Sequence, residues 1–146
     1  MKKFIHTLVQ NNAGYAPLLL RVPVGLILMA HGSQKLFGLF GGYGLAATGQ
    51  WMESIGITPG ELMAFLAGSG EFFGGLFLLL GLLIRPAALV VAFTMLVALF
   101  TVHIHNGLFM ANNGYEYALS LAVIAGSLII SGAGKVSLDN WLARKF

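Results

Sequence analysis

Four long apolar segments dominate this sequence and decide what the chain can fold into. They cover about residues 16–38, 60–83, 86–104 and 116–133. A helix needs about 20 apolar residues to cross the hydrocarbon core of a bilayer, and each segment reaches or approaches that length. Helices are the only suitable element, because lipid offers backbone groups no hydrogen-bond partner and four short segments cannot close a barrel. The sequence therefore predicts an all-α integral membrane four-helix bundle, with residues 1–146 forming a single domain.

Composition agrees with this prediction and excludes several function classes. Hydrophobic residues make up 58% of the chain and charged residues only 9%, whereas about a quarter of a soluble domain is charged. The net charge of +3 includes no Lys/Arg cluster longer than two residues, so the bilayer and not a nucleic acid is the predicted partner. The absence of cysteine excludes disulfides, thiolate metal ligands and cysteine nucleophiles.

The distribution of basic residues predicts the orientation in the membrane. Six of them fall at one end of a four-span arrangement, namely Lys2, Lys3, Arg85, Lys135, Arg144 and Lys145. Of the loops at the other end, only the first has a basic residue nearby, Lys35. Because Lys and Arg concentrate in cytoplasmic segments, both termini are predicted to be cytoplasmic. The first residues lack a signal-peptide pattern, so we expect the first span to be retained.

Two short helices are predicted outside the spans. The loop between the first two spans contains a helical pattern at about residues 46–55, which Trp51 can hold at the membrane interface. Near the C-terminus, Ser137 precedes a stripe of Leu138, Trp141 and Leu142 that is followed by basic residues. That pattern predicts a short interfacial helix.

Glu71, near the middle of the second span, is the strongest functional signal in the sequence. A charge at the bilayer centre costs about 2.5–3.5 kcal/mol, so it calls for a partner or a function. The residues three and four positions away are Ala67, Gly68, Gly74 and Gly75, which are small enough for another helix to approach closely. The first span offers three basic partners, Arg21, His31 and Lys35.

Further polar residues gather at the outer end of the spans. The predicted topology places His31, Gln34, Lys35, His103, His105, Asn106 and Glu116 at this level, and the inner ends carry no comparable set. From these residues and the intramembrane charges we predict a polar ligand pocket in the outer half, formed by Arg21, His31, Lys35, Glu71, His103 and Glu116. The alternative is that the terminal groups only meet water and head groups, and that Glu71 forms a structural clamp.

The pattern does not favour a metal or haem site. His103 and His105 are two residues apart, which separates them by about 200° around a regular helix. The chain also lacks the HExxH and Glu-x-x-His motifs of common metal sites. We therefore predict no metal ligands.

Three sequence motifs resemble the DoxX family of small bacterial inner-membrane proteins. They are HGSQKLFG at His31–Gly38, GSGEFFGGLFLLLGLLIRPAA from Gly68, and GAGKVSLDNWL from Gly132. The family is named after a subunit of an archaeal thiosulfate:quinone oxidoreductase, and other members are linked to oxidative-stress complexes. The resemblance implies a four-helix protein of the bacterial inner membrane that acts as a redox or assembly partner, with quinone as a candidate cofactor. Without cysteine, direct thiosulfate oxidation by this chain alone is not expected.

Three functions follow as hypotheses. The first is a redox-associated subunit, catalytic or accessory, whose outer-half pocket binds a lipophilic ligand such as a quinone and which works with a redox partner protein. The second is a non-enzymatic membrane scaffold or assembly partner. The third is a small-molecule or proton-coupled transporter, although four spans provide little for alternating access unless two copies assemble. A homo-oligomer is compatible with all three hypotheses, because small residues such as Ala118, Ala122 and Gly126 would provide a face for it.

Overall fold

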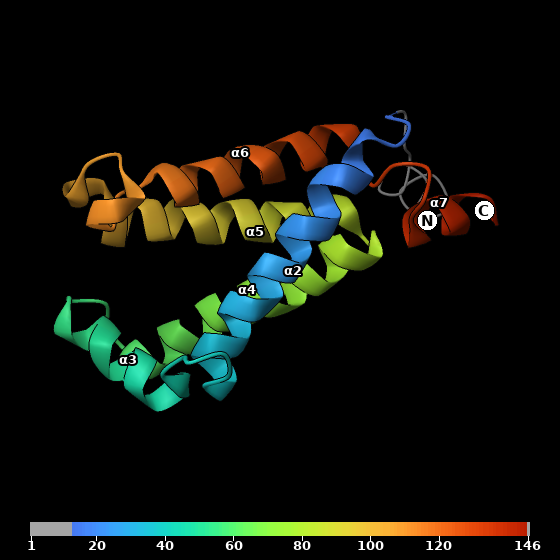
Figure 1. The fold of residues 1–146 in the computed structure, drawn as a ribbon. Helices are drawn as coiled ribbons and strands as arrows, with labels where there is room; N and C mark the ends of the chain where they lie inside the picture. Colours follow the sequence, from blue (N-terminus) through green and yellow to red (C-terminus); the bar gives the residue numbers. More distant parts are fainter. Residues whose placement is uncertain (1–12, 146) are drawn as a thin grey trace.

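The computed structural model describes residues 13–145, and within them every regular element is a helix (Figure 1). The elements are α2 (Ala16–Phe37), α3 (Gly44–Ser54), α4 (Gly60–Leu80), α5 (Ile84–Ala98), η1 (Leu99–His103), η2 (Ile104–Asn106), η3 (Met110–Asn112), α6 (Glu116–Ser131) and α7 (Leu138–Ala143). The predicted all-α fold is confirmed, as are the short loop helix (α3) and the short C-terminal helix (α7). Three helical segments are long and apolar enough to span a membrane, and α6 is a shorter apolar helix.

Helix ends follow from local sequence. Helix α2 stops at Gly38 and α4 stops at Gly81, and both glycines have positive φ angles, of 68° and 63°. A residue in this left-handed conformation ends a helix, and glycine adopts it without a steric penalty. At the other end of the chain, the Ser137 hydroxyl accepts a hydrogen bond from the Asn140 amide at 3.1 Å. This cap begins α7 where the sequence predicts it.

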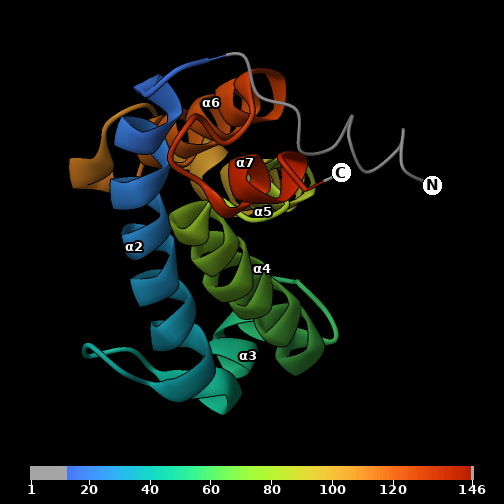
Figure 2. The same cartoon turned by 90° about the vertical axis from the view of Figure 1, so that its right-hand side faces the viewer.

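The long helices form two antiparallel pairs, α2 with α4 and α5 with α6 (Figures 1 and 2). The first pair packs through glycine. A Cβ atom built on Gly25 would lie 2.7 Å from the Gly75 carbonyl oxygen, and one built on Gly32 would lie 2.5 Å from the Phe72 nitrogen. Only residues without a side chain allow backbones to approach this closely. Of the glycines around Glu71, Gly68 and Gly75 therefore bring α4 against α2, whereas Gly74 faces Val91 of α5.

The second pair packs through alanine and aliphatic side chains. Ala88 and Val91 of α5 and Ala125 and Leu128 of α6 are fully buried in the core. Ala118 and Ala122 of α6 are also buried within the monomer, so the expectation that they form a free oligomer face is wrong. A Cβ atom built on Gly126 would meet open space. Of the three residues in the predicted homo-oligomer face, only Gly126 is therefore available for contact with a second copy.

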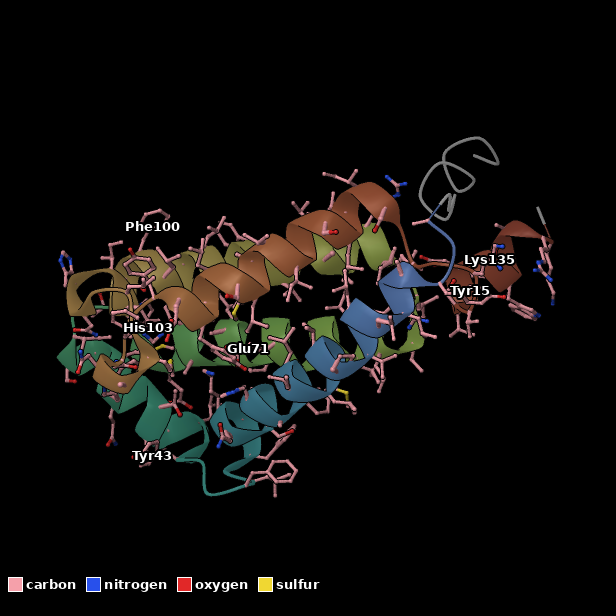
Figure 3. The ribbon with its side chains drawn as sticks, turned by 45° about the horizontal axis from the view of Figure 1, so that its top comes forward. Tyr15, Tyr43, Glu71, Phe100, His103 and Lys135 are labelled. Atoms are coloured by element: carbon pink, nitrogen blue, oxygen red, sulfur yellow. The ribbon has the colours of Figure 1, made fainter. Side chains whose placement is uncertain are left out.

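The two ends of the bundle differ. We call the end that carries α7 the inner end, and the end that carries α3 and η1 the outer end. Residues Tyr15 and Lys135 lie together at the inner end, where the Lys135 amide donates to the Gly14 carbonyl at 2.7 Å (Figure 3). The two termini of the described segment thus share one end. Lys2 and Lys3, on which the orientation prediction partly rests, lie outside the described residues.

Candidate functional site

Glu71 forms an ion pair with Lys35 across the α2–α4 interface. The Lys35 Nζ atom donates to the Glu71 Oε2 atom at 2.6 Å. The Glu71 side chain is only 6% exposed, whereas that of Lys35 is 26% exposed. The acid is thus enclosed among helices, and its base reaches toward the surface. Of the three basic residues that the first span offered, Lys35 is the one that pairs with the buried acid.

His31 extends this cluster toward α6. Its imidazole Nε2 lies 3.5 Å from the Tyr117 hydroxyl, and the two rings are 5.9 Å apart. His31 also lies four residues before Lys35, one turn away on the same face of α2, beside the Lys35–Glu71 pair. We call these four residues the central cluster. It joins α2, α4 and α6, and so it connects the two helix pairs.

Sequence reasoning did not select Tyr117 for the site. The sequence feature that could have identified Tyr117 is its position four residues before Leu121 and eight before Ala125, both of which are buried. Residues spaced by four lie on one helix face. The Tyr117 ring therefore belongs to the inward stripe of α6, with its hydroxyl directed at a polar partner.

Arg21 lies away from the central cluster, at the inner end. Its guanidinium donates to the Leu78 and Ala133 carbonyls at 3.0 Å each, and also to the carbonyls of Leu79 and Val136. Leu78 and Leu79 belong to the last turn of α4, whose carbonyls have no partner within the helix. Arg21 therefore caps α4 and ties it to the segment after α6, and it does not pair with Glu71.

Asp139 completes this inner junction and was not predicted from the sequence. It is fully buried, and its two carboxylate oxygens accept from the Leu83 and Ile84 amides at 2.7 and 2.9 Å. These amides open α5, where the helix dipole favours an anion. Burial raises the pKa of the Asp139 carboxyl, whereas the two amides and Arg21 act to lower it. The junction joins α2, α4, α5 and α7, which makes it a structural centre of the fold.

His103 and Glu116 hold the outer loop between α5 and α6. The His103 Nδ1 atom lies 2.8 Å from the Asn113 carbonyl oxygen, and a Glu116 oxygen accepts from the Met110 amide at 2.6 Å. His103 sits in the π-helical turn η1 and lies toward the outer end relative to Glu71 (Figure 3). Both side chains bind loop backbone. Within the described residues, neither His103 nor Glu116 contacts the central cluster.

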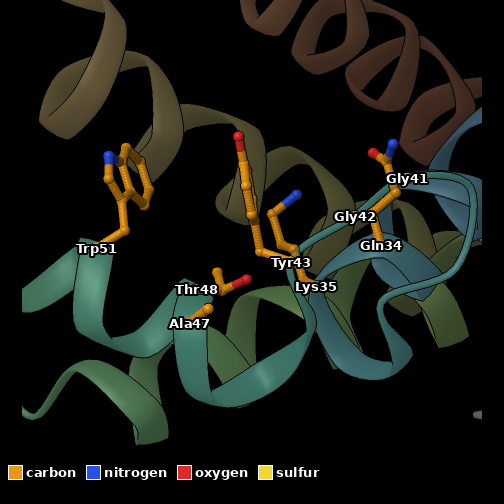
Figure 4. Close-up of a pocket in the computed structure, with 8 residues that line it drawn as sticks. All are labelled: Gln34, Lys35, Gly41, Gly42, Tyr43, Ala47, Thr48 and Trp51. Carbon is orange, nitrogen blue, oxygen red and sulfur yellow. The ribbon is translucent and has the colours of Figure 1, made fainter.

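A cavity of about 510 Å³ lies beside Lys35 at the outer end. Its walls are the end of α2, the turn that follows it, and α3 (Figure 4). The lining residues are Gln34, Lys35, Gly41, Gly42, Tyr43, Ala47, Thr48 and Trp51. Gln34 and Lys35, which were predicted to lie at this level, both line the cavity. The rest of the wall comes from α3 and the turn before it, and not from the predicted residues His103 and Glu116.

The chemical groups at this site suit hydrogen bonding better than metal binding. Among residues 13–145, no group of three or more metal-ligating side chains lies close enough to hold an ion. The central cluster instead provides an ammonium, an imidazole and a phenol hydroxyl, all of which can donate hydrogen bonds. One buried carboxylate adjoins them and can accept or release a proton.

Comparison with known proteins places the chain in a family. The sequence model of DoxX matches residues 16–104, a range that contains both Lys35 and Glu71. The chain belongs to the DoxX family. It is 34% identical over 125 residues to a Bacillus subtilis protein named "Putative oxidoreductase CatD", a match that covers 86% of this chain and 85% of that protein. It is 35% identical over 106 residues to the Escherichia coli "Inner membrane protein YqjF", covering 70% of this chain and 78% of that protein. No solved structure matches it.

Family membership and the apolar helices identify this DoxX protein as a membrane protein that contacts the lipid bilayer. The match ends at residue 104, so α6 and α7 lie beyond it. Tyr117 and Asp139, the two residues that sequence reasoning missed, belong to that second part. The structure therefore adds Tyr117 to the central cluster and Asp139 to the inner junction, both outside the range of the family match.

Proposed function

We propose that this protein is a redox-associated membrane subunit that binds a lipophilic ligand, such as a quinone, next to the central cluster in the outer half of the bundle. The observation that carries the proposal is the Lys35–Glu71 ion pair, whose base adjoins a cavity of about 510 Å³. The oxidoreductase name of the B. subtilis relative supports a redox association. A redox partner protein would exchange electrons with the bound ligand.

The central cluster has the chemistry that such a ligand requires. A bound quinone would supply two-electron, two-proton redox chemistry. Lys35 lines the cavity and carries N–H donors for a carbonyl oxygen of the ligand. Tyr117 and His31 lie 3.5 Å from each other and carry further donors within the cluster. Glu71 holds the Lys35 ammonium in place and can take up or release a proton beside it. Of the four cluster residues, Lys35 lines the cavity, so Lys35 would bind the ring while Glu71 holds Lys35 in position.

We expect Glu71→Gln to weaken the binding of a short-chain quinone analogue by about tenfold. Glutamine has no charge to hold the Lys35 ammonium, so the main donor beside the cavity loses its fixed position. Titration of purified protein in nanodiscs, with melting temperature as the readout, measures this. At 100 times its Kd, a ligand adds about 2.7 kcal/mol of stability, which is easily detected.

Glu61→Gln is the matched control, because Glu61 is an exposed glutamate in the first turn of the same helix. This variant should bind the analogue as the native chain does. Equal binding by the two variants would remove Glu71 from the ligand site. Absence of binding by the native protein would contradict the proposed function.

A scaffold or assembly role is the second candidate, and the same ion pair favours it. The pair joins α2 to α4, and leaving one member without the other destabilises a membrane bundle. Under this function, Glu71→Gln lowers the melting temperature, and the native protein gains no stability from the analogue. The titration described above therefore separates the two candidates.

We also propose that the protein lies in the bacterial inner membrane with both termini in the cytoplasm. Three basic residues, Lys135, Arg144 and Lys145, lie at or beside α7 at the inner end and are exposed. A C-terminal green fluorescent protein fusion should therefore fluoresce, and a C-terminal alkaline phosphatase fusion should be inactive. An active phosphatase fusion would reverse the orientation and place the cavity on the cytoplasmic side.

A further inference from the structure

We propose that the bay between Tyr43 and Trp51 on α3 binds the ring of a planar ligand that carries acceptor oxygens. The inference rests on the proposed function and assigns the ring of its ligand to one place in the protein. It goes beyond that function because α3 contributes none of the residues of the central cluster. The bay is part of the cavity beside Lys35.

The side chains that form the bay share one face of α3. Tyr43, Ala47 and Trp51 are spaced by four residues, so they follow one stripe of the helix. Eight residues of helix span about 12 Å, and Figure 4 shows the two rings standing on the same side of α3 with Ala47 between them. The small Ala47 side chain forms a floor, and the aromatic rings form the two ends.

These rings are available to a ligand. Tyr43 is 85% exposed and Trp51 is 45% exposed. The opposite face of α3 is buried through Gly49 and Met52. The exposed aromatic face therefore belongs to a helix whose other side is already anchored.

Close backbone packing fixes α3 on the start of α4. A Cβ atom built on Gly60 would lie 2.1 Å from the Gly49 carbonyl oxygen, so there is no room for a side chain. The Gly60 amide also donates to the Glu53 carboxylate at 3.1 Å. A preorganised wall of this kind loses little conformational entropy when a ligand binds.

Polar groups at the α2 side of the bay select the chemical class. A lysine ammonium has three N–H donors. One N–H of Lys35 donates to Glu71 at 2.6 Å, so the others remain for a ligand. The charge of Lys35 is balanced by Glu71, so the pair favours a neutral acceptor such as a ring carbonyl over a free anion. The Gln34 amide and the Thr48 hydroxyl also line the cavity.

Tryptophan fluorescence tests this inference, because quinones quench nearby indoles and the chain contains only two tryptophans, Trp51 and Trp141. The probe is decylubiquinone, added to the protein in nanodiscs. In Trp141→Phe, where Trp51 is the reporter, we expect saturable quenching. In Trp51→Phe, where Trp141 on α7 reports, quenching should increase linearly with bulk concentration.

A pair of tyrosine variants provides a second measurement. Tyr43→Ala should weaken saturable quenching about tenfold, because it removes one end of the bay. Tyr15→Ala is the matched control, since Tyr15 is an exposed tyrosine at the inner end, and it should leave binding unchanged.

Failure of the ring site and failure of the proposed function give different results. If decylubiquinone raises the melting temperature but quenches Trp51 no more than Trp141, the ring site is wrong and the proposed function stands. If it neither raises the melting temperature nor quenches either tryptophan saturably, both are wrong. Equal weakening by Tyr43→Ala and Tyr15→Ala would also overturn the ring site.

Discussion

Arg21→Met is expected to lower the free energy of unfolding by about 3–5 kcal/mol, because each buried carbonyl left without a donor costs about 1–3 kcal/mol. Arg21 is 2% exposed and donates to four carbonyls. Methionine would keep the apolar part of the side chain and remove the donor of the Leu79, Ala133 and Val136 carbonyls, whereas the Leu78 carbonyl would keep the Gly81 amide at 3.1 Å. The buried Asp139 carboxylate would also lose the positive charge that acts on it. Thermal unfolding in detergent measures the effect.

Arg144→Met provides the control for this experiment. Arg144 is an exposed arginine next to α7 at the same end, so its loss should change stability by less than 0.5 kcal/mol, the usual range for surface substitutions. Similar melting temperatures for the two variants would show that the inner junction does not hold the bundle together. Ligand binding at the outer end should persist in any Arg21→Met protein that remains folded, because Arg21 lies outside the central cluster.

Gly75→Ala is expected to destabilise the α2–α4 pair by about 1–3 kcal/mol, the usual cost of overpacking. The new Cβ atom would lie 2.6 Å from the Gly25 carbonyl oxygen and 2.8 Å from the Met29 amide nitrogen. Both are backbone atoms, so the helices must move apart as units. That movement would also lengthen the Lys35–Glu71 contact, so we expect weaker binding of the quinone analogue together with a lower melting temperature.

Gly126→Ala tests whether glycine replacement alone causes such a loss. No atom lies within 4 Å of a Cβ built at Gly126, which is also inside a helix. Alanine favours helix by up to about 1 kcal/mol over glycine, so this variant should be at least as stable as the native chain. A loss as large as that of Gly75→Ala would mean that Gly126 is covered, as it would be in a homo-oligomer.

The most accurate predictions from the sequence concern features that depend on neighbouring residues. The long apolar helices follow from the lengths of the apolar segments, and the beginning of α7 follows from Ser137. The small residues around Glu71 predicted a close helix partner, and the first span is that partner. These inferences succeed because helical spacing places side chains on known faces before any tertiary contact forms.

The site was predicted only in part, because several residues met the same description. Arg21, His31 and Lys35 were equally good bases for Glu71 on the evidence of spacing. Because they lie at different positions along α2, Lys35 pairs with Glu71, whereas Arg21 binds carbonyls at the end of α4. His103 and Glu116 were grouped with the pocket because they share its level, yet their hydrogen bonds go to loop backbone. Two residues at the same depth in the membrane can lie on different sides of the bundle, so a shared depth did not show that they share a site.

The sequence by itself determined that the chain is helical and membrane-bound, because hydrocarbon length and backbone hydrogen bonding leave no other solution. It also determined that a buried acid must meet a base, because an unpaired charge in lipid is costly. Only the tertiary structure decided that Lys35 is this base, that Asp139 is buried at the inner end, and that α3 lines the cavity. Those results depend on where glycine contacts let two helices cross, and that geometry comes from packing between segments far apart in the chain.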